Sequence, residues 1–524
     1  MTATIPSSNY RLLGCISSKN DSKRRLGRKR VSPVLLVSIL LSAAYLQLFF
    51  QMVTIQNLLP DWDQSSNLAS FSPQNRVNKH PNPMNFDIDG LQHDRAKLAH
   101  GTFHFGPDSH QVELDPTYQP TFNSVQQELL DDEIIDVQKE KERCARYNYQ
   151  LIDEENPKRR RIFFGALLGD DSMEVLRAVG TEAYNIYHTV SFVEGNTTLN
   201  LSARKWKYYN QNQPSDRLNT LYQLFGPKTK VSVEYYVSTL EGLFGRQSDL
   251  SFENCQREGS TYRWALNGMR PDDIGIISDA DEVFTRDYLR AMQVCDVPEL
   301  RPNQSCGSKQ MASTIVFESS PSCLTKDRRW WHPDAVLGEC VEHVGNSSAH
   351  PPAKREGLDN RHGLPDHGHG GDNFSAYWSE NGLEPESVYP LWMAADLRLE
   401  GRGARSIFRN DGAASGYHFH NFFSSAEDIH IKYHTYGHAD SQAWNKPVWE
   451  LHEDLQLAVD CANEVHREAH YYIDYSESIE MPIYYLNAET RNRRHELWKS
   501  IVKEEEELWN GARKHGEGEM LNSK

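Results

Sequence analysis

The sequence contains no Cys-x-x-Cys motif, no internal repeat and no excess of positive charge outside its first 30 residues. Without Cys-x-x-Cys pairs, a metal site built from cysteines is not expected. Of the net charge of −17, residues 1–30 contribute about +7, so the rest of the chain carries about −24. An acidic body argues against nucleic acid as its partner and is compatible with a protein that binds cations or neutral ligands.

Residues 31–56 lack charged side chains altogether. This run exceeds the roughly 20 apolar residues that cross the hydrocarbon core of a bilayer, so we predict a transmembrane signal anchor. A cleaved signal peptide would have a shorter apolar stretch and a site of small residues after it, and a buried core helix seldom runs this long without a charge. The basic cluster Lys23–Arg30 precedes the run, so the positive-inside rule predicts a cytoplasmic tail at residues 1–30 and a lumenal or extracellular body.

Glycosylation sequons and cysteines agree with a lumenal body. Asn-x-Ser/Thr sequons follow the apolar run at Asn196, Asn200, Asn303, Asn346 and Asn373. The cysteines that follow it are Cys144, Cys255, Cys295, Cys306, Cys323, Cys340 and Cys461. In an oxidising compartment several of these should pair, and their odd number predicts that at least one stays free or pairs between chains.

The rest of the chain divides into three predicted parts. Residues 57–140 are polar and show no sustained periodicity, which predicts a disordered stem between membrane and domain. Residues 141–445 alternate strand patterns with helical ones, which predicts an α/β domain with a mostly parallel sheet flanked by helices. Residues 446–524 are polar with helical periodicity, and we predict a helical C-terminal extension.

Apolar runs mark the predicted strands of the α/β domain. They are RIFFGALLG (Arg161–Gly169), NIYHTVSFVEG (Asn185–Gly195), KVSVEYYVS (Lys230–Ser238) and DIGIISDADE (Asp273–Glu282), with a further strand at Ser313–Ser319. Helices are predicted between them at Ser172–Ala183 and Gln256–Met269. This alternation is typical of βαβ units.

The fourth strand pattern ends in three carboxylates, Asp279, Asp281 and Glu282. Open α/β sheets bind ligands beyond the carboxyl ends of their strands. On an extended strand Asp279 and Asp281 point the same way, and two carboxylates so close repel each other unless a cation or a proton lies between them. The segment therefore predicts a site for Mg²⁺ or Mn²⁺, which can neutralise the charge of a leaving diphosphate.

Other interpretations of the same residues stay open. Asp281 and Glu282 could cap a helix that follows them. The letters DADEV also match the signature of haloacid-dehalogenase-like phosphatases, in which Asp279 would be the nucleophile and Asp281 a general acid/base. The further groups that such a phosphohydrolase needs do not form a convincing set downstream. A membrane protein that binds glycans without catalysis is a third possibility.

A second dense segment, GYHFHNFFSSAEDIHIKYHTYGHAD (Gly416–Asp440), contains five histidines and many aromatic residues. Together with FVEGNTT and DIGIISDADEVF, it resembles the V-E-S-N-x-T, D-x-I-I-x-S-D-x-D-E-I and G-W-H-x-S-x-F segments of glycosyltransferase family 17. The resemblance covers about residues 160–440. The chain departs from the family at Tyr417, where Trp is usual, and at His420, where Ser is frequent, and residues 323–396 do not align.

The resemblance implies a GT-A-like fold, a UDP-sugar donor, a Mn²⁺ or Mg²⁺ ion and a single-pass type II protein of the Golgi membrane. The expected activity is transfer of a sugar, by analogy N-acetylglucosamine from UDP-N-acetylglucosamine, to an N-glycan or a related acceptor. Residues 141–445 would form the catalytic domain.

Site residues follow by carrying the family's motifs onto this sequence. The implied metal ligands are Asp279, Asp281 and His418, with His438 as a further choice. The implied donor contacts are Glu194, Asp279, Arg257 and Lys432. The catalytic base that an inverting reaction requires does not come from this carry-over, and its candidates are Glu282, Asp372 and Asp396. The aromatic segment RRWWHP (Arg328–Pro333) could stack against sugar rings or pack in the core.

Overall fold

The structure, a computed structural model, describes residues 101–522 apart from several gaps. The gaps are residues 119, 132–133, 170, 199–203, 209–214, 239–249, 303–308, 313, 331, 342–343, 346–404, 407–414, 436–469 and 473–480. The predicted tail at residues 1–30 and anchor at residues 31–56 therefore lie outside the described residues. None of the described helices is both long and apolar enough to cross a membrane.

An eight-stranded sheet forms the centre of the fold, in the order β1-β4-β3-β2-β5-β10-β7-β11. Its central strands are β2 (Ile162–Leu168), β3 (Tyr187–Gly195), β4 (Lys230–Ser238) and β5 (Ile274–Asp279), which are parallel to one another. The helices between them are α5 (Met173–Glu182), α6 (Asp216–Leu224) and α7 (Leu250–Leu266). The predicted α/β class, with a mostly parallel central sheet flanked by helices, is confirmed.

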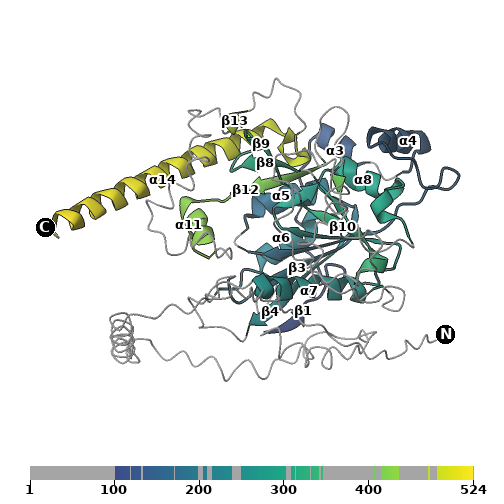
Figure 1. Ribbon diagram of the computed structural model, residues 1–524, viewed down its shortest axis with the longest axis horizontal. Coiled ribbons are helices and arrows are strands. Elements are labelled where there is room, and N and C mark those ends of the chain that lie inside the picture. The colour runs from purple at the N-terminus through teal and green to yellow at the C-terminus, as the bar shows by residue number, and fades with distance from the viewer. Residues whose placement is uncertain are drawn as a thin grey trace, which may run out of the picture. The chain divides into compact units, whose positions relative to one another are not determined.

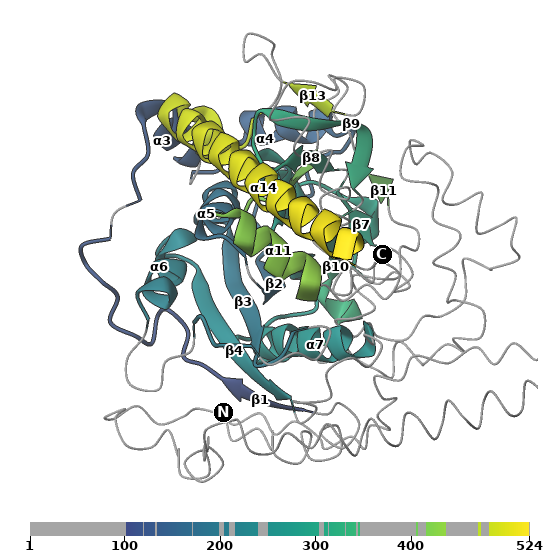
Figure 2. The same cartoon turned by 90° about the vertical axis from the view of Figure 1, so that its left-hand side faces the viewer.

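Both faces of the central strands are covered. Phe163 of β2 packs with Trp264 of α7 in one core, whereas its neighbour Phe164 joins the larger core on the other face with residues of α5 and α6. Figure 2 shows α5 and α6 on one side of β3 and β4, and α7 on the other. Burial on both faces explains why these strands are nearly continuous apolar runs in the sequence.

Two glycines let α7 approach the sheet closely. A Cβ atom at Gly165 of β2 would lie 2.5 Å from Cβ of Ser260, and one at Gly275 of β5 would lie 2.6 Å from the ring of Trp264. A larger side chain at either position would push the helix away. The close packing fixes α7, and with it Arg257, beside the carboxyl end of β5.

The connections of the central strands create a topological switch point. The chain adds β3 and then β4 on one side of β2, and then returns to add β5 on the other side. Open α/β sheets bind ligands at such a reversal, beyond the carboxyl ends of the two strands that flank it. Here those ends are Leu168 and Asp279.

A second sheet has five strands, in the order β13-β9-β8-β12-β6. Its strands are β6 (Glu282–Phe284), β8 (Thr314–Glu318), β9 (Cys323–Trp330), β12 (Gly416–His420) and β13 (His470–Tyr472). β8 and β12 are parallel, and the other pairs are antiparallel. The strand predicted at residues 313–319 is β8, so it belongs to this sheet rather than to the first.

Shorter elements complete the first sheet. They are β1 (Gly101–Phe105), β7 (Gln310–Met311), β10 (Asp334–Leu337) and β11 (Arg405–Ser406), and the 3₁₀ turns η3 (Pro298–Leu300) and η4 (Gly338–Cys340) lie beside them in the chain. β10 pairs antiparallel with β5 on one side and with β7 on the other.

The folded unit begins before residue 141, where the sequence predicts its boundary. β1 pairs antiparallel with β4 along its whole length. The helix α3 (Ser124–Leu130) is also in place, because Gln126 donates a 2.8 Å hydrogen bond to the carbonyl of Ile483. Part of the segment predicted as stem, residues 57–140, therefore belongs to the domain. A short edge strand adds little apolar sequence, so composition does not reveal it.

A disulfide joins two helices at one side of the domain. Cys144 of α4 (Val137–Arg146) is bonded to Cys295, which caps α8 (Arg286–Val294). Cys323 and Cys340 are disulfide-bonded as well. Asp287 at the start of α8 accepts hydrogen bonds from Arg143 at 3.0 Å and Arg146 at 2.8 Å. The expectation that several cysteines pair is met among the described residues.

The last helices pack on one another and are linked to residues that follow strands of the second sheet. α11 (Ala426–Thr435) lies beside α14 (Ala488–Asn522), as Figure 1 shows, and His430 of α11 contacts Glu505 of α14 at 2.5 Å. The 3₁₀ turn η7 (Ile483–Leu486) precedes α14. The buried Arg494 of α14 donates to the carbonyl of Ser319, the residue after β8, and to the carbonyl of Phe423, three residues after the end of β12. This arginine holds the ends of two strands of the second sheet in register.

Candidate metal centre

The carboxylates of the DADE segment do not share one strand face. β5 ends at Asp279, residues Ala280 and Asp281 form a turn, and β6 begins at Glu282. The predicted orientation of Asp279 and Asp281 assumes that the strand continues, and the turn breaks that assumption. As a result, Asp281 joins Glu282 and His418, whereas Asp279 turns to a different partner.

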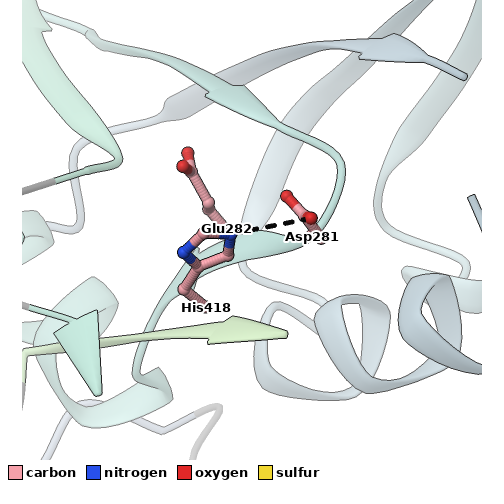
Figure 3. Close-up of side chains that lie close together, drawn as sticks. All are labelled: Asp281, Glu282 and His418. Carbon is pink, nitrogen blue, oxygen red and sulfur yellow. Dashed lines mark ion pairs between the residues drawn. The ribbon is translucent and has the colours of Figure 1, made fainter. Parts of the chain in front are cut away.

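Asp281, Glu282 and His418 form a cluster that could hold a metal ion. One ligand atom of each lies within 4.8 Å of the others. Figure 3 shows the three side chains, with a dashed line for the pair between His418 Nε2 and Asp281 Oδ2, which are 3.6 Å apart. Two atoms bound to one cation at about 2.1 Å each are separated by about 3 to 4 Å, so this spacing fits a shared ion.

The position of His418 depends on how β12 pairs with its neighbouring strands. β12 lies between β8 and β6, and His418 is directly opposite Glu282 in the antiparallel register with β6. The N–H of Phe419 donates to the carbonyl of Asp281 at 2.8 Å, which ties the two halves of the cluster together. A Cβ atom at Gly416 would lie 2.7 Å from the carbonyl oxygen of Val283, so only glycine fits at the start of the strand.

The charges around Asp281 favour its ionised form. Burial alone would raise the pKa of Asp281, but His418 and then Lys432 outweigh it and hold the pKa below its ordinary value. Lys432 of α11 lies nearby, with its ammonium over the ring of Phe423 and 3.5 Å from the side-chain oxygen of Asn421. An ionised carboxylate is the form that binds a cation.

Glu282 is fully buried and its carboxylate is already engaged. It accepts hydrogen bonds from the N–H of Asp279 at 3.1 Å, from the Ser278 hydroxyl at 3.2 Å and from the indole N–H of Trp330. These contacts suit a group that shapes the turn and supports a cation. They leave little freedom for Glu282 to act as the catalytic base that the sequence suggests.

The helix-cap interpretation of Asp281 and Glu282 is wrong. The helix that follows is α8, and its N-cap is Thr285, whose hydroxyl accepts from the N–H of Tyr288. Val283 and Phe284 of β6 lie between the two acids and the N-cap of the helix, so neither acid is its capping residue.

Asp279 pairs with Arg257 rather than with the cluster. The guanidinium of Arg257 lies 2.6 Å from an Asp279 carboxylate oxygen and also donates to the carbonyl of Ser278 at 2.9 Å. Arg257 is buried, whereas 40% of the Asp279 side chain is exposed. The partly exposed carboxylate lies at the switch point, and its assignment as a metal or donor ligand stays a prediction.

Glu194 lies at the carboxyl end of β3, as predicted, and is fully buried. Its carboxylate accepts hydrogen bonds from the N–H groups of Lys207, at 2.6 Å, and Tyr208. It thereby fixes the segment at residues 204–208 over the end of the sheet. A contact between Glu194 and a nucleoside stays a prediction, and the bonds it makes give it a clear supporting role.

Asp171 is a further acid at the switch point, and it is not among the site residues predicted from the sequence. Its carboxylate accepts from the N–H of Gly169 at 2.5 Å. Burial and the nearby Asp281 raise the pKa of Asp171, against the opposing effects of that hydrogen bond and of Arg204. The signal was present in the sequence, because GALLGDDS places acids after the first strand in the same way as IGIISDADE does after the fourth.

Aromatic and imidazole rings border the cluster. Trp330, from the predicted RRWWHP platform, lies 5.4 Å from His418 between ring centroids. His420, two residues after His418, pairs with Glu318 of β8 at 2.7 Å, and burial lowers the pKa of its imidazole. Asp372, Asp396 and His438, also predicted as site residues, lie outside the described residues.

The ligand atoms that the cluster offers fit a divalent cation. Two carboxylates and one imidazole are ligands that Mn²⁺ accepts, and buried Nδ1 of His418 has no hydrogen-bond partner among the described residues. Searched against models of protein families and against curated proteins, the chain matches none. The site must therefore be interpreted from its own geometry.

Proposed function

We propose that the protein is a metal-dependent glycosyltransferase that moves a sugar, with UDP-N-acetylglucosamine as the expected donor, onto an N-glycan or a related glycan. One observation carries this proposal. The Asp281–Glu282–His418 cluster lies just beyond β5, at the switch point of a parallel α/β sheet, where nucleotides and other phosphate ligands bind in such folds.

The surroundings of the cluster support a diphosphate ligand. Lys432 is close enough to lower the pKa of Asp281, and Arg257 lies at the end of β5 through its pair with Asp279. Cationic side chains beside a cation site suit a ligand with several negative charges. Trp330 adds an aromatic surface of the kind that stacks against sugar rings.

The phosphohydrolase alternative is supported less well. It requires Asp279 as a nucleophile, yet its carboxylate is held by the Arg257 guanidinium at 2.6 Å. It also requires Asp281 to act as an acid/base, whereas His418 and Lys432 favour its permanently ionised form. A cation ligand needs that form, and a general acid does not.

In this mechanism the chain's own residues orient the donor and exclude water. Asp281 and His418, with Glu282 behind them, would hold Mn²⁺ or Mg²⁺, and Lys432 would lie against the phosphates. The bound cation supplies charge neutralisation of the UDP leaving group. The acceptor oxygen forms a bond to the anomeric carbon while the bond from that carbon to the diphosphate oxygen breaks; UDP leaves with the electron pair, and a general base takes the proton of the acceptor hydroxyl.

The predicted membrane anchor and the disulfide suit a lumenal enzyme. The Cys144–Cys295 bond would form in the oxidising secretory pathway. A single-pass type II protein of the Golgi membrane, with residues 101–522 in the lumen, is the location we propose.

The test uses the full-length protein with UDP-N-acetylglucosamine, Mn²⁺ and a glycopeptide acceptor. We expect transfer that EDTA abolishes and that Asp281→Asn reduces at least about 1,000-fold. Asp272→Asn is the matched control, because Asp272 is an exposed acid in the loop before β5, and it should leave the rate unchanged. Transfer by Asp281→Asn at the wild-type rate would contradict the proposal.

Two other outcomes would replace the proposal. Release of phosphate from p-nitrophenyl phosphate without sugar transfer would favour the phosphohydrolase. Saturable glycan binding, with no turnover of any UDP-sugar, would favour a binding protein.

A further inference from the structure

A buried chain of charges ends at His332, close to the candidate metal centre. Lys309 Nζ lies 2.8 Å from Oδ2 of Asp334, and His332 Nδ1 lies 3.0 Å from Oδ1 of the same carboxylate. The side chains of Lys309 and Asp334 are fully buried, whereas 21% of the His332 side chain is exposed. Asp334 is part of β10 and is opposite Ile277 of β5 in the sheet, so the chain of charges is anchored in the rigid core.

The protonation of this chain fixes the tautomer of His332. Burial alone would raise the pKa of Asp334, but Lys309 and His332 outweigh it and hold the pKa below its ordinary value. An ionised carboxylate can only accept hydrogen bonds, so Nδ1 of His332 must carry the proton. When His332 is neutral, Nε2 carries the free lone pair, and the hydrogen bond that the imidazole makes to the described residues is the one between Nδ1 and Asp334. The same logic prepares the histidine of a catalytic triad as a base.

The position of His332 relative to the cluster suits a base. The rings of His332 and His418 each lie 5.4 Å from the ring centroid of Trp330, so the centroids of the two imidazoles are at most about 11 Å apart. A hydroxyl oxygen about 3 Å from a base, a carbon about 3 Å further on, a leaving oxygen about 2 Å beyond that carbon and a cation about 2 Å from that oxygen together span about 10 Å. The upper limit on the separation of the two imidazoles is compatible with a reacting sugar between them.

We propose that His332 is the general base of the transfer reaction, with Asp334 and Lys309 as its positioning residues. This inference rests on the proposed function. The proton of the acceptor hydroxyl passes to Nε2 of His332 as the acceptor oxygen bonds to the anomeric carbon. The carbon–oxygen bond to UDP breaks at the same time, and the imidazolium later releases its proton to solvent. Attack opposite the leaving group inverts the anomeric configuration.

The charged and titratable groups near His332 belong to several segments of the chain. Asp334 on β10 faces Nδ1, and Lys309 lies behind that carboxylate. Across the indole of Trp330 lie Glu282 and His418. Of these groups, Asp334 is hydrogen-bonded to the imidazole.

The decisive variant is His332→Asn, because an asparagine amide can still donate to Asp334 while the base atom is lost. With UDP-N-acetylglucosamine, Mn²⁺ and the glycopeptide acceptor, we expect the transfer kcat to fall at least about 100-fold. The affinity for UDP with Mn²⁺ should stay within about threefold of the wild type. The acid limb of the pH–rate profile should disappear, since it reports protonation of the base.

His188→Asn is the matched control. His188 is another partly buried histidine, at the start of β3 and thus at the end of the strand opposite to the site, and burial lowers its pKa to about 4. Its replacement should leave kcat and the pH profile unchanged. Asp334→Asn tests the positioning role, and we expect about a tenfold or larger fall in kcat with a displaced acid limb.

The outcomes separate this inference from the proposed function. Transfer that is lost in Asp281→Asn but retained within about fivefold in His332→Asn overturns the role of His332 alone. A parallel loss of UDP affinity, melting temperature and rate in His332→Asn indicates a structural role and overturns it too. Absence of transfer by the wild type overturns both proposals.

Discussion

The two sheets of the domain differ in what they contribute to the site. The central strands β2 to β5 are parallel, follow one another in the chain and are buried on both faces by apolar side chains. The second sheet assembles strands from residues 282–472 and carries polar groups toward the cluster, among them Glu282, Glu318 and His418. The first sheet thus supplies a stable frame, and the second brings the ligands to its edge.

This difference leads to separable expectations. Changes that weaken the frame should lower the free energy of unfolding and leave cation affinity intact. Changes in the second sheet should lower cation affinity and, where they loosen its packing, stability as well. The following variants test that separation, beginning with the largest expected effect.

Removing the Cys144–Cys295 bond should have the largest effect on the frame. The bond closes a separation of 151 residues, so its loss increases the entropy of the unfolded chain, and we expect Cys144→Ser with Cys295→Ser to cost about 4 kcal/mol of unfolding free energy. Urea denaturation followed by circular dichroism measures it. The Mn²⁺ affinity of the folded variant should be unchanged. An unaltered denaturation midpoint would contradict the expectation.

Arg494→Met should lower the unfolding free energy by about 3 kcal/mol, because the buried guanidinium satisfies the carbonyls of Ser319 and Phe423. The same denaturation experiment measures the loss. Arg493→Met is its control, since Arg493 is the exposed neighbour on the same helix and its replacement should change stability by less than about 0.5 kcal/mol. Equal effects of the two variants would rule out the role given to Arg494.

His418→Asn should weaken Mn²⁺ binding about 30-fold, or about 2 kcal/mol, while leaving the denaturation midpoint nearly unchanged. The imidazole is one of three groups in the cluster, so its loss removes a ligand without opening the core. Calorimetric titration with MnCl₂ measures the affinity. His110→Asn, at an exposed position, should bind like the wild type. Unchanged binding by His418→Asn would remove it from the site.

Asp287→Asn should have the smallest effect, about 1.5 kcal/mol at pH 7, and this effect should depend on pH. Burial alone would raise the pKa of Asp287, but Arg143 and Arg146 outweigh it and lower the pKa. Its stabilising contribution is therefore complete above the ordinary aspartate pKa of about 4 and is lost as pH falls through the lowered value.

The measurement for Asp287 is the difference in unfolding free energy between variant and wild type from pH 7 to pH 2. It should be constant down to about pH 4 and shrink below that value. Asp216→Asn is the control, because Asp216 is also an acid in the first turn of a helix but is exposed. A difference that grows as the pH falls would have the wrong sign for the proposed ion pairs.

The sequence predicts the frame well and the second sheet poorly, for a physical reason. Strands buried on both faces are apolar runs, so β2, β3, β4 and β5 can be recognised from local composition. The pairing of β12 with β6 and β8 joins residues more than 100 positions apart, and nothing in either segment specifies its partner.

The candidate site was also predictable only in part. Asp281 and His418 are named from the sequence and are brought together by the structure. The turn at Ala280, which separates Asp279 from Asp281, was not predictable from a pattern that assumes a straight strand. His332 lies in the RRWWHP segment, which the sequence marks for its aromatic residues only, and the contacts with Asp334 and Trp330 that place it near the cluster appear only in the structure.

The order of the elements along the chain has a consequence for biosynthesis. The frame from β2 to β5 leaves the ribosome long before β12, α11 and α14, which carry His418, Lys432 and Arg494. Domains begin to fold while the chain is still growing. A nascent chain can therefore hold the frame in place while the cation site is still incomplete, so metal capture would be a late event in the maturation of this protein.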